Sequence, residues 1–180
     1  MEQFTGQAMR IDVHDATPAD AARFAEFGAR TFYESFAVDN SEENMRLHLA
    51  SAWSPARQLA EIRDPAVDTF ILTDDAGAWL GFAQLRAGKV HESVPSEGAI
   101  ELMRFYVDRP WQGRGVATEL MQVVKQRARR RGATTLWLGV WENNPRAQAF
   151  YRKHGFATVG SQVFVVGTDP QSDHVMMCSL

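Results

Sequence analysis

The segment VDRPWQGRGVAT, residues 107–118, carries residues whose types and spacing suit the binding of an anion. An apolar run typical of a strand precedes the segment, and a run with helical periodicity follows it. The first N–H groups of a helix have no partner within the helix, and the positive end of the helix dipole lies beside them, so phosphate is the expected guest. Gly113 and Gly115 remove side chains that would block the backbone, and Ala117 keeps the next turn small.

Two phosphate-binding motifs and one structural alternative compete for this segment. A Walker loop requires GxxxxGK followed by serine or threonine, which the sequence lacks. A dinucleotide-binding loop requires GxGxxG, and GRGVAT at residues 113–118 lacks the third glycine, although Glu142 ends the next predicted strand as a ribose ligand would. In the structural alternative, the two glycines only turn a strand into a helix. The segment by itself does not decide between the last two interpretations.

The composition argues against several classes of function. With 180 residues, of which 45% are apolar and 23% charged, the chain has the make-up of one soluble globular domain. The formal charge of −3 provides no basic field for nucleic acid. The sequence has no run of about 18 apolar residues and no secretory leader, so we expect a cytoplasmic protein that does not bind a membrane.

Cysteine and histidine usage argues against a metal site or a disulfide. Cys178 is the single cysteine, which excludes an internal disulfide and a thiolate zinc site. The five histidines show no HExxH or similar ligand spacing, so we expect no metal. Cys178 lies among apolar residues without a neighbouring base in the sequence, so we expect it to be buried rather than nucleophilic.

The elements that must position the glycine turn are strands and helices in mixed order. We expect strands at residues 9–16, 98–107, 134–141, 157–167 and 174–180, a hairpin at 68–88, and helices at 17–37, 41–53, 54–64, 116–131 and 144–156. The helix after the turn has one apolar stripe, formed by Val116, Leu120, Met121, Val124 and Ala128. Residues 1–8 show no pattern and are expected to be a loose terminus, whereas residues 9–180 are expected to form a single domain.

Two motifs together resemble a known family. Residues 107–121 are similar to the acetyl-CoA loop of the Gcn5-related N-acetyltransferases, the GNAT family, and residues 140–156 look like the family's second signature. The matching positions are Gln112, Gly115 and Ala117 in the QxxGxA form of the loop, and Asn144, Tyr151, Gly155 and Phe156 in the second motif. More narrowly, residues 136–156 and 164–177 resemble the PaiA-type branch, which includes polyamine acetyltransferases.

The resemblance implies a fold and a co-substrate. The fold is of the α/β (α+β) class, a mixed and mostly antiparallel central sheet with splayed fourth and fifth strands and helices on both faces. The co-substrate is acetyl-CoA. The cofactor-binding positions that the resemblance implies are Tyr106 and Val107 for pantetheine, Gln112, Gly113, Arg114, Gly115, Val116, Ala117 and Thr118 for the pyrophosphate, and Asn144 and Tyr151 in the second motif. Lys153 or Arg152 is expected near the nucleotide phosphates, with a surface charge as the alternative for either.

Acetyl transfer requires a neutral amine, and an alkyl amine with a pKa of about 10.4 is almost wholly protonated at neutral pH. Glu101 matches the position at which many members of the family carry a general-base glutamate. Because Glu101 lies six residues before Val107 on one predicted strand, we expect both side chains on the same face. The alternative is a carboxylate at the strand edge, paired with Arg104 or another cation.

The departing thiolate needs a proton, and Tyr151 matches the family tyrosine that supplies it. A phenol is protonated at neutral pH and is a competent acid for a thiolate. The alternative role for Tyr151 is that of a core aromatic residue. The backbone N–H of Val107 is expected to meet the oxyanion. Cys178 is the only conceivable nucleophile for a covalent acetyl-enzyme, and it is expected to be buried. Direct attack within a ternary complex is therefore the expected mechanism.

The acceptor site implied by the family lies beside the first helices. Phe32, Tyr33 and Phe36, with Glu34 and Trp53 nearby, suit an alkyl ammonium through cation–π and ion-pair contacts, and a packed helix face explains them equally well. The expected function is transfer of acetyl from acetyl-CoA to a primary amine of a polyamine-like small molecule. Acetylation of a protein N-terminus or lysine is the alternative enzyme, and acyl-CoA sensing without catalysis is the alternative from another class. The oligomeric state stays open between monomer and homodimer.

Overall fold

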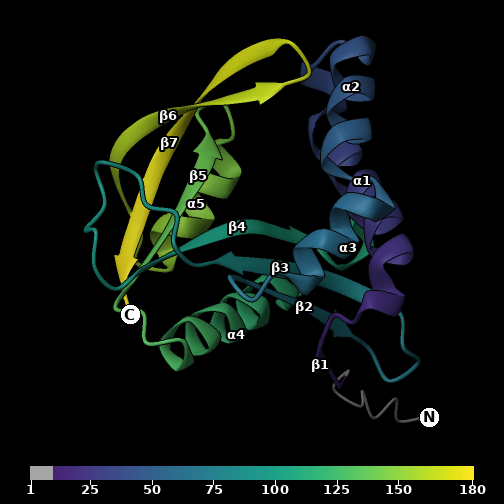
Figure 1. Cartoon of the computed structure of the whole chain (residues 1–180), viewed down its shortest axis with the longest axis horizontal. Helices are drawn as coiled ribbons and strands as arrows, with labels where there is room; N and C mark the ends of the chain where they lie inside the picture. Colours follow the sequence, from purple (N-terminus) through teal and green to yellow (C-terminus); the bar gives the residue numbers. More distant parts are fainter. Residues whose placement is uncertain (1–9) are drawn as a thin grey trace, which may run out of the picture.

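A computed structural model describes residues 10–180, so the expectation for residues 1–8 lies outside the described residues. The chain forms one domain in which helices flank a seven-stranded sheet (Figure 1). The helices are η1 (Pro18–Asp20), α1 (Ala21–Phe36), η2 (Ala37–Asp39), α2 (Glu42–Ala52), α3 (Pro55–Arg63), η3 (Arg109–Trp111), α4 (Val116–Arg130) and α5 (Pro145–Lys153). The strands are β1 (Asp12–Asp15), β2 (Val67–Thr73), β3 (Trp79–Arg86), β4 (Ala99–Val107), β5 (Thr135–Trp141), β6 (Ala157–Val166) and β7 (Asp169–Ser179).

The sheet runs in the order β1-β2-β3-β4-β5-β7-β6, and every neighbouring pair is antiparallel except β4 and β5. The parallel pair is short, because only residues 99–101 of β4 pair with residues 135–137 of β5. Beyond these residues β4 continues along β3 and β5 continues along β7, so the two strands diverge (Figure 1). The predicted fold class and the splay of the fourth and fifth strands are confirmed.

The helices bury the two faces of the sheet in separate cores. On one face, the apolar stripe of α4 and the inward side of α5 cover a core that includes Leu85, Leu102 and Leu138. On the other face, α1 places Phe24 and Phe27 on β2 and β3, with Trp53 from the segment after α2 packed beside them. Figure 1 shows α1, α2 and α3 together on one side of the sheet and α4 on the opposite side.

Local sequence signals explain where the helices begin. Thr17 and Asp20 form a reciprocal capping box at η1, and Ser41 and Ser54 cap α2 and α3 through their side chains. Asn144 caps α5 by accepting a hydrogen bond from the Ala147 N–H at 3.0 Å. None of the described helices combines the length and the apolar character needed to cross a membrane.

One strand begins earlier than the sequence indicates. The predicted last strand starts at residue 174, whereas β7 starts at Asp169 and pairs with β6 from its first residue. The polar residues before 174 resemble a turn in isolation, but the hairpin extends the pairing through Pro170 and Asp173. A tight turn at Gly167 makes this possible, since its φ of 65° suits glycine.

A bulge in β4 changes which side chains share a face. Arg104 pairs with Gln84 and Leu102 pairs with Leu85, so Met103 has no partner on β3. The expectation that Glu101 and Val107 share one face is therefore wrong. With one extra residue between them, the two side chains point to opposite faces of the sheet.

Candidate active site

Two adjoining hollows lie where β4 and β5 diverge. We call the first the inner cavity, which has a volume of about 340 Å³ and is lined by residues from α1, α2, β4, β5, β6 and β7. We call the second the loop groove, about 840 Å³ in volume, which is lined by the glycine turn and by the start of α5. The residues that line both are Ser35, Phe36, Phe105, Val107, Gln112, Trp141, Asn144, Ala147 and Tyr151. A ligand in the loop groove can therefore extend into the inner cavity along the free edge of β4.

The glycine turn presents its backbone to the loop groove. Gly113 and Gly115 have φ values of 75° and 89°, so both adopt the left-handed conformation that favours glycine. A methyl group added to either glycine would have no other atom within 4 Å, so the space beside the turn is open. Within residues 10–180, the backbone N–H groups from Gly113 to Ala117 donate no hydrogen bond, whereas Thr118 N–H already donates to the Gly115 carbonyl. These free donors at the start of α4 suit a pyrophosphate.

Side chains around the groove add to this anion site. Gln112 donates from Nε2 to the Val107 carbonyl at 3.1 Å, which ties the turn to the end of β4. The groove is also lined by Lys153, Arg109 and Arg146. The guanidinium of Arg114 instead lies 5.5 Å from the Trp111 ring centroid, and Arg114 lines neither hollow. The side chain of Val116, the first residue of α4, is buried in the core. The contribution available from residues 114 and 116 is thus their backbone N–H.

Tyr151 stands at the junction of the two hollows. Its side chain is buried against the rings of Phe105, Phe150 and Phe156 at centroid distances of 5.6 to 6.2 Å. Burial raises the pKa of the Tyr151 phenol well above its ordinary value, so the hydroxyl keeps its proton at neutral pH. Tyr151 packs in the core, as the structural alternative expects, and it also lines both hollows, so its role as the acid stays a prediction.

Glu101 lies away from both hollows. Its Oε2 accepts a hydrogen bond from Arg86 Nε at 2.8 Å and lies 2.6 Å from Arg86 Nη2 in the same ion pair, and Lys89 Nζ lies 3.6 Å from Oε1. The side chain is 7% exposed and lines neither the inner cavity nor the loop groove. These contacts correspond to the structural alternative, a carboxylate paired with a cation, although the partner is Arg86 rather than Arg104.

The predicted acceptor residues separate into two groups. Phe32, Phe36 and Trp53 line the inner cavity. Tyr33 is 50% exposed and lines neither hollow. Glu34 lines the loop groove and pairs with Arg30, which also bonds Asp108 at 2.6 Å.

The lining of the inner cavity includes residues that the sequence does not identify as site residues, such as His48 and Asp173. Its ring lining comprises Phe32, Phe36, His48, Trp53, Phe105, Tyr106, Trp141, Tyr151 and Phe164. His48 stacks on Phe32 at 4.4 Å, and burial lowers the pKa of the imidazole, so it is neutral at pH 7. Asp173 contributes a carboxylate from β7 to the cavity lining. Asp173 and Val175 lie two residues apart on β7 and are both buried, so the period of the strand is the sequence signal that places Asp173 on a buried face. A strand that starts at residue 174, as the sequence predicts, leaves this signal out.

Arg104 closes the inner cavity near the α2–α3 connection. Its guanidinium lies 4.2 Å from the Trp53 ring centroid and donates to Glu61, to Gln84 Oε1 at 2.7 Å and to the Ala52 carbonyl at 3.2 Å. This buried network joins β4 to α2 and α3, and it neutralises the positive charge that Arg104 would otherwise bring to the cavity.

Comparisons with known proteins agree with this geometry. The model of the acetyltransferase (GNAT) family matches residues 29–156. An uncharacterised N-acetyltransferase of Lactobacillus delbrueckii subsp. lactis is 28% identical over 94% of this chain and 98% of its own length. An uncharacterised N-acetyltransferase of Mycobacterium tuberculosis strain H37Rv is 32% identical over 89% of this chain and 98% of its own.

A solved structure shares the fold over nearly the whole chain. The PaiA N-acetyltransferase of Thermoplasma acidophilum in complex with coenzyme A superposes with a TM-score of 0.76 at 18% identity, covering 96% of this chain and 100% of that one. The free amides of the glycine turn, the cations of the loop groove and the open edge of β4 fit coenzyme A. The chain therefore belongs to the acetyltransferase (GNAT) family and is an acetyl-CoA-dependent N-acetyltransferase.

Proposed function

We propose that the protein acetylates a primary amine of a small molecule, with polyamine-like alkyl amines as the first class of acceptor, by direct attack in a ternary complex. The observation that carries the proposal is the inner cavity, which adjoins the loop groove at Tyr151 and is lined mainly by aromatic rings. Rings of Phe, Tyr and Trp attract an alkyl ammonium through their electron-rich faces and pack against its carbon chain.

The size of the cavity favours a small acceptor. A volume of about 340 Å³ lies at the lower end of small-molecule sites. The β6–β7 hairpin also contacts α2, since Asn44 Oδ1 accepts hydrogen bonds from Thr168 N–H and Oγ1 at 3.0 Å. Asn40, which lies between η2 and α2, accepts a hydrogen bond from Gln171 Nε2 at 2.6 Å. Figure 1 shows the tip of the β6–β7 hairpin beside α2.

The residues at the junction support a division of roles in the reaction. The amides from Gly113 to Ala117 hold the pyrophosphate, and the edge of β4 at Tyr106 and Val107 pairs with pantetheine. The acetyl group then lies beside Tyr151, whose hydroxyl gives its proton to the departing thiolate. The Val107 N–H stabilises the oxyanion.

The position of Cys178 supports direct attack. Its thiol is buried under α4, burial raises its pKa, and it lines neither hollow. Initial velocities at varied acetyl-CoA and amine should give intersecting lines in double-reciprocal plots, and parallel lines would contradict the ternary complex.

The acceptor class is tested by thiol release from acetyl-CoA with spermidine, simple alkyl amines, amino acids, aminoglycosides and peptides. We expect release with the alkyl amines and an acetylated amine in the mass spectrum. Release with peptides alone would replace the proposal by protein acetylation. No release with any acceptor, despite saturable acetyl-CoA binding, would favour an acyl-CoA sensor.

A further inference from the structure

We propose that Asp173 contacts the ammonium group of the acceptor and takes its proton before acetyl transfer. The inference rests on the proposed function, because it assigns a residue to the amine substrate of that same site. Asp173 supplies the carboxylate that the chemistry requires, and Glu101 lies away from both hollows.

The contrast between buried carboxylates is the first observation. Glu61, Glu101 and Asp173 are the buried acidic side chains among the described residues. Glu61 pairs with Arg104 and Arg57, and Glu101 pairs with Arg86. Asp173, at 7% exposure, makes no ion pair within residues 10–180. A buried carboxylate without a cation is unfavourable for folding, which is typical of a group kept to meet a charged ligand.

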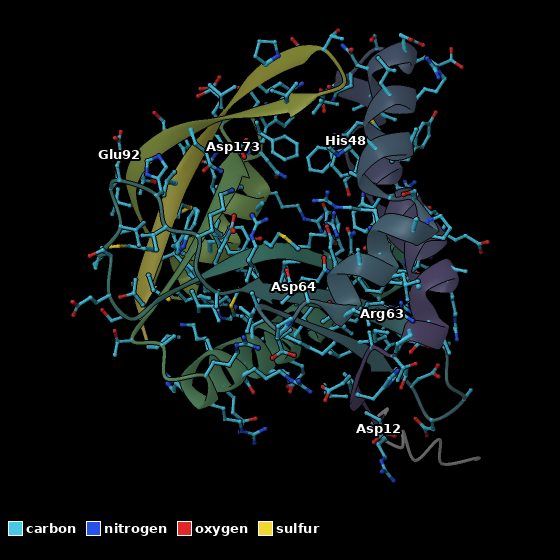
Figure 2. All side chains as sticks on the ribbon, in the orientation of Figure 1. Asp12, His48, Arg63, Asp64, Glu92 and Asp173 are labelled. Carbon is cyan, nitrogen blue, oxygen red and sulfur yellow. The ribbon has the colours of Figure 1, made fainter. Side chains whose placement is uncertain are left out.

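The second observation is the position of Asp173. In the part of the chain that the structure describes, it is the one carboxylate that lines the inner cavity, and it lies on β7 opposite Trp141 of β5 and Gln162 of β6. Figure 2 shows Asp173 and His48 on opposite sides of the space that the inner cavity occupies. An ammonium that contacts Asp173 therefore shares the cavity with the aromatic residues that line it.

Gly139 shows that space is reserved for this carboxylate. A methyl group at Gly139 would lie 3.1 Å from Asp173 Oδ2 and 2.3 Å from Gln162 Nε2. Gly139 does not have a positive φ, so the conformation of the backbone does not explain the glycine. Its missing side chain leaves room for the Asp173–Gln162 pair at the cavity wall.

The surroundings of Asp173, above all its burial, make its carboxylate a proton acceptor suited to near-neutral pH. Burial, and secondarily the charge of Glu142, raises the pKa of Asp173 to about 6, whereas a hydrogen bond from Gln162 opposes the shift. The other ionisable groups that line the cavity are His48, Arg104, Tyr106 and Tyr151. Arg104 is engaged by Glu61, and burial raises the pKa of Tyr106 and of Tyr151, so none of these three groups supplies a base. The neutral imidazole of His48 is the competing base, and the pH profile of Asp173→Asn distinguishes the two.

The proton balance of the step is complete with these residues. One ammonium proton passes to the Asp173 carboxylate, and the nitrogen lone pair then attacks the thioester carbonyl. The carbon–sulfur bond breaks and the thiolate takes the proton of Tyr151. A second nitrogen proton restores the Tyr151 hydroxyl, the amide keeps the third, and Asp173 releases its proton to water.

Replacement of Asp173 by asparagine tests the assignment. We expect Asp173→Asn to lower kcat/KM for n-butylamine by about 100-fold or more, the range of a lost general base. The pH profile of wild-type kcat/KM should show an acid limb near pH 6, and the variant should lack it. If Asp173 had only a structural role, the profile of Asp173→Asn would keep the acid limb.

Two other variants serve as controls. Asp169→Asn removes an exposed carboxylate from the same strand, outside both hollows, and should leave turnover unchanged. Glu101→Gln should keep the acid limb. If Asp173→Asn keeps both its rate and its acid limb while the wild type acetylates amines, the inference is overturned and the proposed function stands.

Binding of the amine provides a readout that does not depend on turnover. We expect n-butylammonium to bind the wild type at pH 8 at least about tenfold more tightly than Asp173→Asn, measured by calorimetry. Equal affinities would overturn the inference even if no amine is acetylated, whereas the absence of turnover alone would overturn the proposed function.

Discussion

At the scale of single residues, Tyr151 offers the clearest separation of binding from chemistry. Tyr151→Phe removes the hydroxyl and keeps the ring that packs against Phe105 and Phe156. We expect kcat to fall by about 100-fold, because the thiolate loses its acid, with the Kd for acetyl-CoA within about twofold. Steady-state kinetics and calorimetry measure the two quantities. An unchanged kcat would remove Tyr151 from the acid role.

The raised pKa of Asp173 also predicts how stability depends on pH. An acid whose folded pKa is about 6, against an ordinary 3.8, binds its proton more tightly in the folded state. Its contribution to stability is therefore complete below about pH 4 and is lost as the pH rises through 6. We expect Asp173→Asn to gain stability relative to the wild type between pH 4.5 and 7 in urea denaturation. A constant difference over that range would contradict the raised pKa.

The residues of the site differ in how far the sequence reveals them. Gln112, Asn144 and Tyr151 follow from short-range motifs, and each lies at a hollow in the structure. Asp173 and His48 carry no motif, because they come from separate elements that meet only in the folded chain. Glu101 matches a family position in sequence, yet its surroundings depend on Arg86, which pairs with it from the neighbouring strand.

At the scale of elements, the turn before α4 makes a prediction with a matched control. Gly115 and Gly132 have φ values of 89° and 79°, at the start and just after the end of the same helix. Alanine at either position should destabilise the fold by about 1–2 kcal/mol through backbone strain. Only Gly115→Ala should also weaken acetyl-CoA binding, by about tenfold or 1.4 kcal/mol, because the added methyl group obstructs the free amides.

Thermal denaturation and calorimetry with acetyl-CoA measure these two effects. If Gly132→Ala weakens acetyl-CoA binding as much as Gly115→Ala, the effect comes from general destabilisation. In that case the turn does not hold the pyrophosphate.

Most elements follow from periodicity and capping, and the exceptions have physical causes. Helix starts at Ser41, Ser54 and Asn144 are encoded locally by side-chain caps. The bulge at Met103 is a single extra residue whose presence depends on pairing with β3, so no pattern within β4 indicates it. The early start of β7 depends likewise on its pairing with β6.

At the scale of the whole molecule, the helical side of the inner cavity is held to the sheet by the Arg104 network. Arg104 and Glu61 have side chains 13% and 10% exposed, so their ion pair is largely buried. Arg104→Ala should destabilise the protein by about 3–5 kcal/mol, because it leaves Glu61 charged and desolvated. Arg57→Ala removes the other partner of Glu61. Because the Arg57 side chain is 56% exposed, its loss should change the free energy of unfolding by about 1 kcal/mol or less.

Urea denaturation of the two variants at pH 7 distinguishes these values. Equal losses of stability would show that the buried pair contributes no more than the exposed one. The network would then not be what fixes α2 and α3 to β4.

The architecture is predictable from sequence only through the family resemblance. Periodicity indicates strands and helices, but the divergence of β4 and β5 depends on the pairing stopping at Glu101 and Trp137. The joining of the two hollows depends in turn on this divergence. The sequence therefore predicts a binding turn for acetyl-CoA, and the fold adds the aromatic cavity beside it.

A crystal structure of the complex with acetyl-CoA tests the central claim most directly. We predict the pyrophosphate at the backbone N–H groups from Gly113 to Ala117, with pantetheine along the free edge of β4 and the acetyl group facing the inner cavity beside Tyr151. Acetyl-CoA bound elsewhere, or an acetyl group directed away from the inner cavity, would contradict the account.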